Sequence, residues 1–126
     1  MYLDGGTSDS IPLKFMEDKG YDKILVIETQ PKEYLKSKQK FMPVIKRAFR
    51  KYPNMIKAMG DRYLMYNDEK HYVREREEKK EIFVIRPRQS LHINDKTKDP
   101  KEIQRVYDLG RQEALDNLEA LKAFLS

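Results

Sequence analysis

Two short apolar runs dominate the hydrophobic pattern of the chain. Residues Ile24 to Ile27 and Ile82 to Ile85 are continuously apolar and mostly β-branched, which predicts two buried strands, the first covered on both faces. A shorter apolar pair, Tyr2 and Leu3, ends in Asp4 and predicts another strand. Helical patterns separate these runs, so we expect parallel strands joined by right-handed crossovers. The predicted fold class is α/β, with a partial parallel sheet and flanking helices.

Four segments carry helical signals. Leu13 to Lys19 predicts a short helix closed by Gly20. Pro53 and Gly60 interrupt the chain, and a long helix is expected from Asp61 to Lys79 with Tyr63, Tyr66 and Val73 facing inward. A helix starting at Phe41 should bury an apolar stripe made of Phe41, Ile45, Ala48, Phe49 and Tyr52.

The last helix has a strong start signal. Asp99 can cap it, Pro100 suits its first position and Glu102 completes a capping box. Its apolar positions lie along one face and predict an amphipathic helix packed on the sheet; they are Ile103, Val106, Tyr107, Gly110, Ala114, Leu118, Leu121, Phe124 and Leu125.

The amino-terminal segment contains the candidate chemistry. Asp4 follows an apolar pair and precedes Gly5 and Gly6, so the acid is expected at the carboxyl end of a strand, where open α/β sheets place their active sites. Pro12 suits the first turn of a helix, with Asp9 or Ser10 as its cap. From these residues alone, a plain turn is favoured over a catalytic acid.

The longer string, D-G-G-x-x-D-x-x-P followed by a short helix and the strand at residues 24–27, resembles the patatin-like phospholipase family. The likeness to its bacterial members continues through the second strand, Arg86-Pro87 and the final helix. In that family the Asp of D-G-G is half of a Ser–Asp catalytic dyad. The resemblance therefore implies that Asp4 is the general base, that Gly5 and Gly6 permit close approach of the serine and substrate, and that Asp9 supports the turn.

The chain departs from that family in lacking a nucleophile elbow, G-x-S-x-G. The nearest string, residues 6–10, has no closing glycine and follows an acid instead of a strand, so Ser8 is interpreted as a turn hydroxyl. The resemblance thus implies that residues 1–126 form the carboxyl-terminal portion of a patatin-like three-layer α/β/α hydrolase domain. The nucleophile-bearing half would be absent, and the chain alone would be inactive. The parent would hydrolyse a phospholipid, another lipid or a simple ester.

Composition limits the other classes of function. The chain has 126 residues and no cysteine, and its two histidines, His71 and His92, lack ligand spacing. We therefore expect no metal site, no cofactor and no histidine-based triad. No apolar run can span a membrane and no signal peptide is visible. A cytoplasmic location, with peripheral contact to a membrane, is the expectation.

Positive charge is concentrated in one segment. Between residues 32 and 57 Glu33 is the single acid, against nine basic residues: Lys32, Lys36, Lys38, Lys40, Lys46, Arg47, Arg50, Lys51 and Lys57. The favoured interpretation is a solvated face opposite a core stripe. The alternative function is a non-catalytic basic module that binds anionic membrane or nucleic acid. Under the hydrolase interpretation nucleic acid is disfavoured, and the bared sheet predicts self-association.

Overall fold

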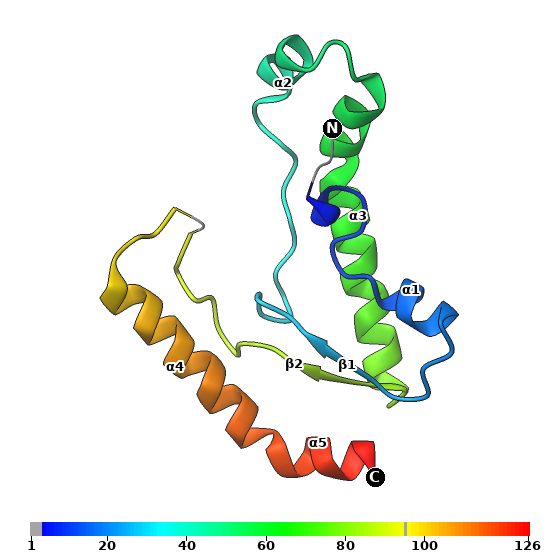
Figure 1. Ribbon diagram of the computed structural model, residues 1–126, viewed down its shortest axis with the longest axis vertical. Helices are drawn as coiled ribbons and strands as arrows, with labels where there is room; N and C mark the ends of the chain where they lie inside the picture. The colour runs from blue at the N-terminus through cyan, green and yellow to red at the C-terminus, as the bar shows by residue number, and fades with distance from the viewer. Residues whose placement is uncertain (1–3, 95) are drawn as a thin grey trace. The chain divides into compact units, whose positions relative to one another are not determined.

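The computed structural model describes residues 4–94 and 96–126 (Figure 1). The elements run from the short 3-10 turn η1 (Gly5–Thr7) to α1 (Leu13–Asp18), β1 (Ile24–Ile27), α2 (Met42–Ala48), α3 (Pro53–Glu78), β2 (Ile82–Ile85), α4 (Pro100–Asp116) and α5 (Leu118–Leu125). The strand predicted at Tyr2 and Leu3 lies outside the described residues. No helix in the described part of the chain is both long and apolar enough to cross a membrane.

The chain divides into two compact units. The first comprises residues 1–20 and 35–76, and the second comprises residues 21–34 and 77–126. The second unit contains the sheet, in which β1 and β2 pair in parallel with Ile24 opposite Ile82 and Ile27 opposite Ile85. The predicted mixed α/β class and the parallel pairing are therefore confirmed.

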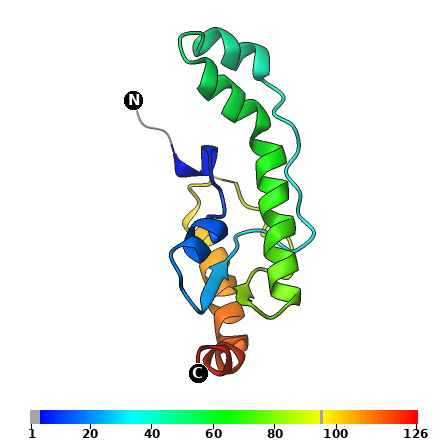
Figure 2. The same cartoon turned by 90° about the vertical axis from the view of Figure 1, so that its right-hand side faces the viewer.

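In the first unit, two segments are attached to α3: the amino-terminal segment (residues 4–20) and the segment before α2 (residues 35–41). Glu17 of α1 accepts hydrogen bonds from Tyr72 at 2.6 Å and from Arg76 at 2.7 Å. Asn67 binds the backbone of Lys36 twice, accepting from its N–H at 2.8 Å and donating to its carbonyl at 3.1 Å. Figures 1 and 2 both show the segment before α2 running alongside α3.

In the second unit, the face of the sheet that carries Phe83 contacts α5. The rings of Phe83 and Phe124 lie 5.7 Å apart, and Lys23 Nζ lies 5.9 Å from the Phe124 ring centre. The chain after β2 is fastened to α4 by Arg88, which pairs with Asp116 at 2.9 Å and with Glu113 at 3.3 Å.

Several stretches predicted to be covered are exposed instead. In β1 only Ile24 and Val26 are buried, whereas Ile27 is 71% exposed, so this strand is not covered on both faces. In the segment around α2, Ile45 is buried but Phe41 is 68% exposed and Tyr52 is also exposed. The final helical region behaves similarly, with exposed apolar positions at Ile103, Tyr107, Gly110, Ala114, Leu118 and Leu125. These apolar faces are formed but only partly covered by the described chain.

Helix boundaries also differ from the prediction at two residues. Gly60 does not interrupt the chain: the helix expected to start at Asp61 begins at Pro53 and runs through Gly60, where a Cβ atom would lie 3.2 Å from Met42 Cε. Close packing of Met42 therefore explains the glycine. The final helix is divided at Asn117, whose side-chain amide donates to the Glu113 carbonyl at 2.8 Å. Such a bond competes with the helical ladder. By contrast, Gly20 closes α1 at φ +79° as expected.

Candidate functional site

Asp4 caps η1, the turn that contains both glycines of the D-G-G string. Its Oδ1 accepts the backbone N–H of Gly6 at 3.0 Å. The carboxylate is exposed, and its other oxygen, Oδ2, has no hydrogen-bond partner within the described chain. One oxygen is therefore held in place while the other remains open to a proton donor. A base for a serine hydroxyl also needs partial desolvation, which these residues do not give to Asp4.

The D-G-G turn is fastened to α3 through Arg62. Arg62 Nε donates to the Gly6 carbonyl at 2.8 Å, and the Ser10 hydroxyl donates to the same oxygen at 2.7 Å. A Cβ atom at Gly6 would lie 3.3 Å from Arg62 Nη2, whereas one at Gly5 would meet nothing within 4 Å. A side chain at position 6 would therefore require Arg62 to shift by a few tenths of an ångström, and the predicted approach of a serine and substrate to Gly6 stays a prediction.

A second attachment lies two helical turns further along α3. The Glu69 carboxylate accepts the backbone N–H of Ser10, at 3.1 and 3.2 Å from its two oxygens, and that of Ile11 at 2.9 Å. Burial raises the pKa of Glu69; the hydrogen bonds from Ile11 and Ser10 oppose this rise, and the nearby Asp9 adds to it. Residues 6–11 are therefore held at both ends by one rigid helix.

The capping prediction for this segment was wrong. The residue before α1 is Pro12, and no side chain caps that helix, so neither Asp9 nor Ser10 does. Both are used differently: Ser10 bonds Gly6, and Asp9 lies beside Glu69. The Ser8 hydroxyl donates to the Gly5 carbonyl at 3.3 Å, which agrees with its interpretation as a turn hydroxyl.

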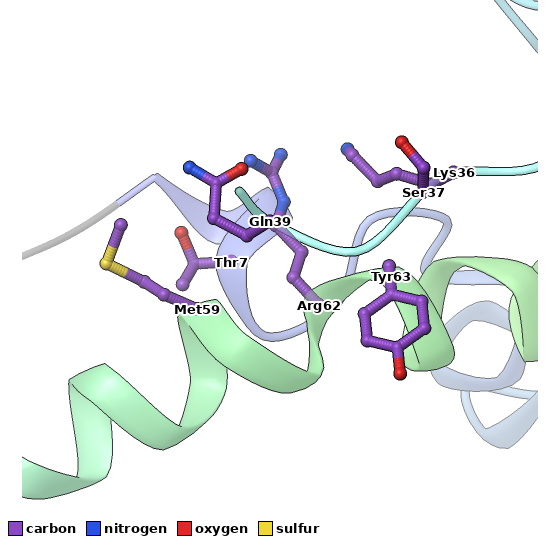
Figure 3. Close-up of a pocket in the computed structure, with 7 residues that line it drawn as sticks. All are labelled: Thr7, Lys36, Ser37, Gln39, Met59, Arg62 and Tyr63. Carbon is purple, nitrogen blue, oxygen red and sulfur yellow. The ribbon is translucent and has the colours of Figure 1, made fainter. Parts of the chain in front are cut away.

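A small pocket of about 90 Å³ lies next to the turn, between α3 and the segment before α2 (Figure 3). Two cationic side chains, Lys36 and Arg62, line this pocket. Burial lowers the pKa of Lys36, Arg62 lowers it further, and Glu69 acts in the opposite direction. The remaining lining residues are Thr7, Ser37, Gln39, Met59 and Tyr63.

The basic segment ends in a surface that combines charge with apolar side chains. Lys46, Arg47, Arg50 and Lys51 are exposed, as the solvated-face interpretation predicted. The opposite stripe was expected in the core, yet Phe41, Val44 and Tyr52 are exposed as well. From residue 34 to residue 60 the sequence has no acid. We call the seven residues just named the α2 basic surface.

Arg86, just past β2, pairs with neighbouring acids. Arg86 Nε lies 2.6 Å from Glu28 Oε2 and its Nη2 lies 2.7 Å from Glu77 Oε2. Both carboxylates belong to the same unit as Arg86. These ion pairs give Arg86 a structural role.

Among residues 4–94 and 96–126, no group of three or more His, Cys, Asp or Glu side chains is placed to hold a metal ion. His71 and His92 are both exposed.

Sequence reasoning missed Arg62, Glu69 and Lys36 as parts of the site. Arg62 and Glu69 are seven residues apart on α3, which places them on one face with Tyr66 and Val73. Charged residues inside a stripe that is otherwise predicted to face inward are a usable signal, because such groups are buried only when they are paired. Lys36 gave no comparable signal, since it is one of many lysines in its segment.

Comparison with known families places the chain in one of them. The family described as a domain of unknown function, DUF6363, matches residues 52–126, more than half of the sequence, and the chain belongs to it. The matched part includes Arg62 and Glu69 on α3, but not the D-G-G turn or the residues of α2. Searches of curated proteins and of solved structures found no match.

Proposed function

We propose that this chain is the carboxyl-terminal part of a patatin-like serine acyl-ester hydrolase, in which Asp4 is the general base of a Ser–Asp dyad. The missing half would supply the serine and the oxyanion hole, and it would complete a three-layer α/β/α domain. The substrate would be a phospholipid, another lipid or a simple ester, cleaved through an acyl-serine intermediate.

The hydrogen bonding of the Asp4 carboxylate is the main support for this proposal. Gly6 N–H fixes Oδ1 at 3.0 Å, and Oδ2 is open. The turn that carries this acid is held to α3 by Arg62 and Glu69. Geometry is the first requirement of a general base, and a carboxylate on a turn that is hydrogen-bonded to a long helix meets it.

The incomplete burial of the sheet fits the same proposal. Leu25 and Ile27 of β1 are exposed although both are apolar. Within the part of the chain that the structure describes, each strand of the two-stranded sheet also has one unpaired edge. Strand edges and apolar faces of this kind are normally covered, and an amino-terminal half would cover them and desolvate Asp4.

The test is the Asp4→Asn substitution in the parent protein that contains the upstream half. Asn is nearly isosteric with Asp and its amide oxygen can still accept Gly6 N–H, but it cannot take the serine proton. Steady-state ester turnover should fall by roughly 10²–10⁴-fold with an unchanged melting temperature. Asp9→Asn is the matched control and should retain turnover. Near-parental turnover of Asp4→Asn, or a parent gene without a G-x-S-x-G string, would exclude the proposal.

A second candidate function is attachment to an anionic membrane through the α2 basic surface. The observation that favours it is the exposure of Phe41 and Val44 among basic side chains, because an interfacial site needs an apolar part to insert as well as positive charge. Double-stranded DNA would be bound chiefly through its phosphates, and therefore through the charge. This attachment is compatible with lipid hydrolysis by the parent.

Vesicle sedimentation tests this second function. Replacing Phe41 and Val44 with Ser should reduce binding to vesicles of phosphatidylglycerol, whereas binding to double-stranded DNA should be unaffected by the same change. Replacing Lys46, Arg47, Arg50 and Lys51 with Gln should reduce both. Equal vesicle binding by both variants and the unchanged chain would rule out the membrane function.

A further inference from the structure

The pocket beside the D-G-G turn gathers donors and positive charge around a small volume. Lys36 and Arg62 are its two charged lining residues, and Thr7, Ser37 and Gln39 add hydroxyl and amide groups. Figure 3 shows Arg62 and Gln39 directed to the same side of the pocket, with Lys36 and Ser37 on the segment before α2. Among the residues that the structure describes, no carboxylate lines the pocket. Its volume of about 90 Å³ suits a group of only a few heavy atoms.

The two cations are held there at an electrostatic cost. The backbone of Lys36 is fixed by Asn67, and its Nζ lies 4.9 Å from the centre of the Tyr66 ring. Burial and the neighbouring Arg62 both lower the pKa of Lys36, so its ammonium group is destabilised relative to water. Glu69 opposes this effect without lining the pocket. A bound anion would relieve the destabilisation directly.

We propose that this pocket binds a phosphate group, with Lys36 as a point charge and Arg62 as a hydrogen-bond donor. The guanidinium fork has five N–H donors, and only Nε is used by Gly6. The remaining N–H groups can therefore contact phosphate oxygens, and the hydroxyls of Thr7 and Ser37 can add to them.

The position of the pocket connects this inference with the proposed hydrolase. Arg62 Nη2 and Asp4 Oδ1 lie 3.3 and 3.6 Å from one common point, the Cβ position of Gly6. A phosphate held by Arg62 would thus sit next to the D-G-G turn. If the chain is part of the proposed hydrolase, on which this step rests, the phosphate belongs to the headgroup of its lipid substrate. The alternative source of the same chemistry is a free phosphate ester.

The test uses the 126-residue chain and does not require catalysis. Inorganic phosphate and glycerol 3-phosphate are titrated into the chain by calorimetry, and vesicles of phosphatidylglycerol are tested by sedimentation in parallel. Lys36→Gln should weaken binding about tenfold or more, since it removes a charge-assisted contact. Lys38→Gln is the matched control, because Lys38 is exposed and lies outside the pocket. It should leave binding unchanged.

The arms of the experiment separate the sources of phosphate. Lys36-dependent binding of the soluble phosphates supports a site for free phosphate esters, and Lys36-dependent binding of vesicles alone supports a lipid headgroup. If Lys36→Gln and Lys38→Gln weaken every ligand equally, or if no ligand binds, the pocket is not a phosphate site. Failure of the hydrolase proposal would appear separately, as unchanged turnover in the Asp4→Asn parent.

Discussion

The guanidinium of Arg62 and the backbone of Gly6 form one hydrogen bond, in which Nε–H donates to the glycine carbonyl at 2.8 Å. The same guanidinium occupies the space that a side chain at position 6 would need, since a Cβ atom there would lie 3.3 Å from Nη2. Gly6 does not have a positive φ. Whether a side chain fits at position 6 therefore depends on movement of Arg62 and not on backbone conformation.

This arrangement predicts different outcomes for two adjacent glycines. Gly6→Ala should lower the free energy of unfolding by about 1 kcal/mol, because Arg62 must move to admit the methyl group. Gly5→Ala is the control, as its Cβ would meet no atom within 4 Å, and its effect should stay within about 0.5 kcal/mol. Urea denaturation of both variants measures the difference. Equal effects would show that Arg62 does not pack on Gly6.

Glu69 predicts a pH dependence of stability with a defined sign. Its folded-state pKa is raised, chiefly by burial, so its stabilising contribution is fully present below the ordinary glutamate pKa. That contribution is lost as the pH rises through the raised value. Glu69→Gln cannot titrate. The difference in unfolding free energy between the unchanged chain and this variant should therefore decrease as the pH rises from about 4, near the ordinary glutamate pKa, through the raised pKa.

Urea denaturation at several pH values across that window provides the measurement. A difference that grows with pH would mean that the hydrogen bonds from Ser10 and Ile11 outweigh burial, so that Glu69 is stabilised as a carboxylate. That result would reverse the assigned direction of its pKa.

The ion pair beside the sheet predicts a large loss when one partner is removed. The Glu28 side chain is only 3% exposed and pairs with Arg86 at 2.6 Å. Arg86→Met would leave this buried carboxylate without its guanidinium and should cost about 3 kcal/mol of unfolding free energy. Because a glutamine at position 28 would carry no charge, the double variant Glu28→Gln, Arg86→Met should recover part of the loss. Denaturation of the single and double variants tests this, and an equal or larger loss in the double variant would contradict it.

The exposed side chains of β1 predict self-association of the isolated chain. Ile27 is 71% exposed and lies on a strand that has one unpaired edge among the described residues. Apolar surface next to such an edge promotes pairing between chains. Sedimentation velocity should show association that rises with concentration and is reduced by Ile27→Lys. Lys38→Gln, at an exposed position of the other unit, serves as the surface control. A monomer at all concentrations would contradict the prediction.

Local signals in the sequence predicted several elements with close boundaries. The runs at residues 24–27 and 82–85 are the two strands. Asp99 caps α4 by accepting the N–H of Lys101 at 3.0 Å. Each of these features is determined by residues within a few positions of one another, so it can be predicted from the sequence.

Other features depend on contacts between distant residues and could not be predicted in this way. Gly60 resembled a helix end because glycine disfavours helix interiors by about 1 kcal/mol, yet the contact with Met42 explains it. The apolar stripe containing Phe41 predicted packing against another apolar surface. A sequence does not specify whether that surface belongs to the same chain, and Phe41 is exposed. The pocket likewise required Lys36 to be brought next to Arg62 by Asn67.

Asn67 recognises the main chain of Lys36 and not its side chain. The two hydrogen bonds, at 2.8 and 3.1 Å, resemble one rung of a sheet ladder built with a side-chain amide. Any residue other than proline offers the same N–H and C=O at position 36. The backbone at position 36 would therefore stay in place when its side chain is replaced. A single substitution there could change which ligand the pocket prefers without moving the backbone.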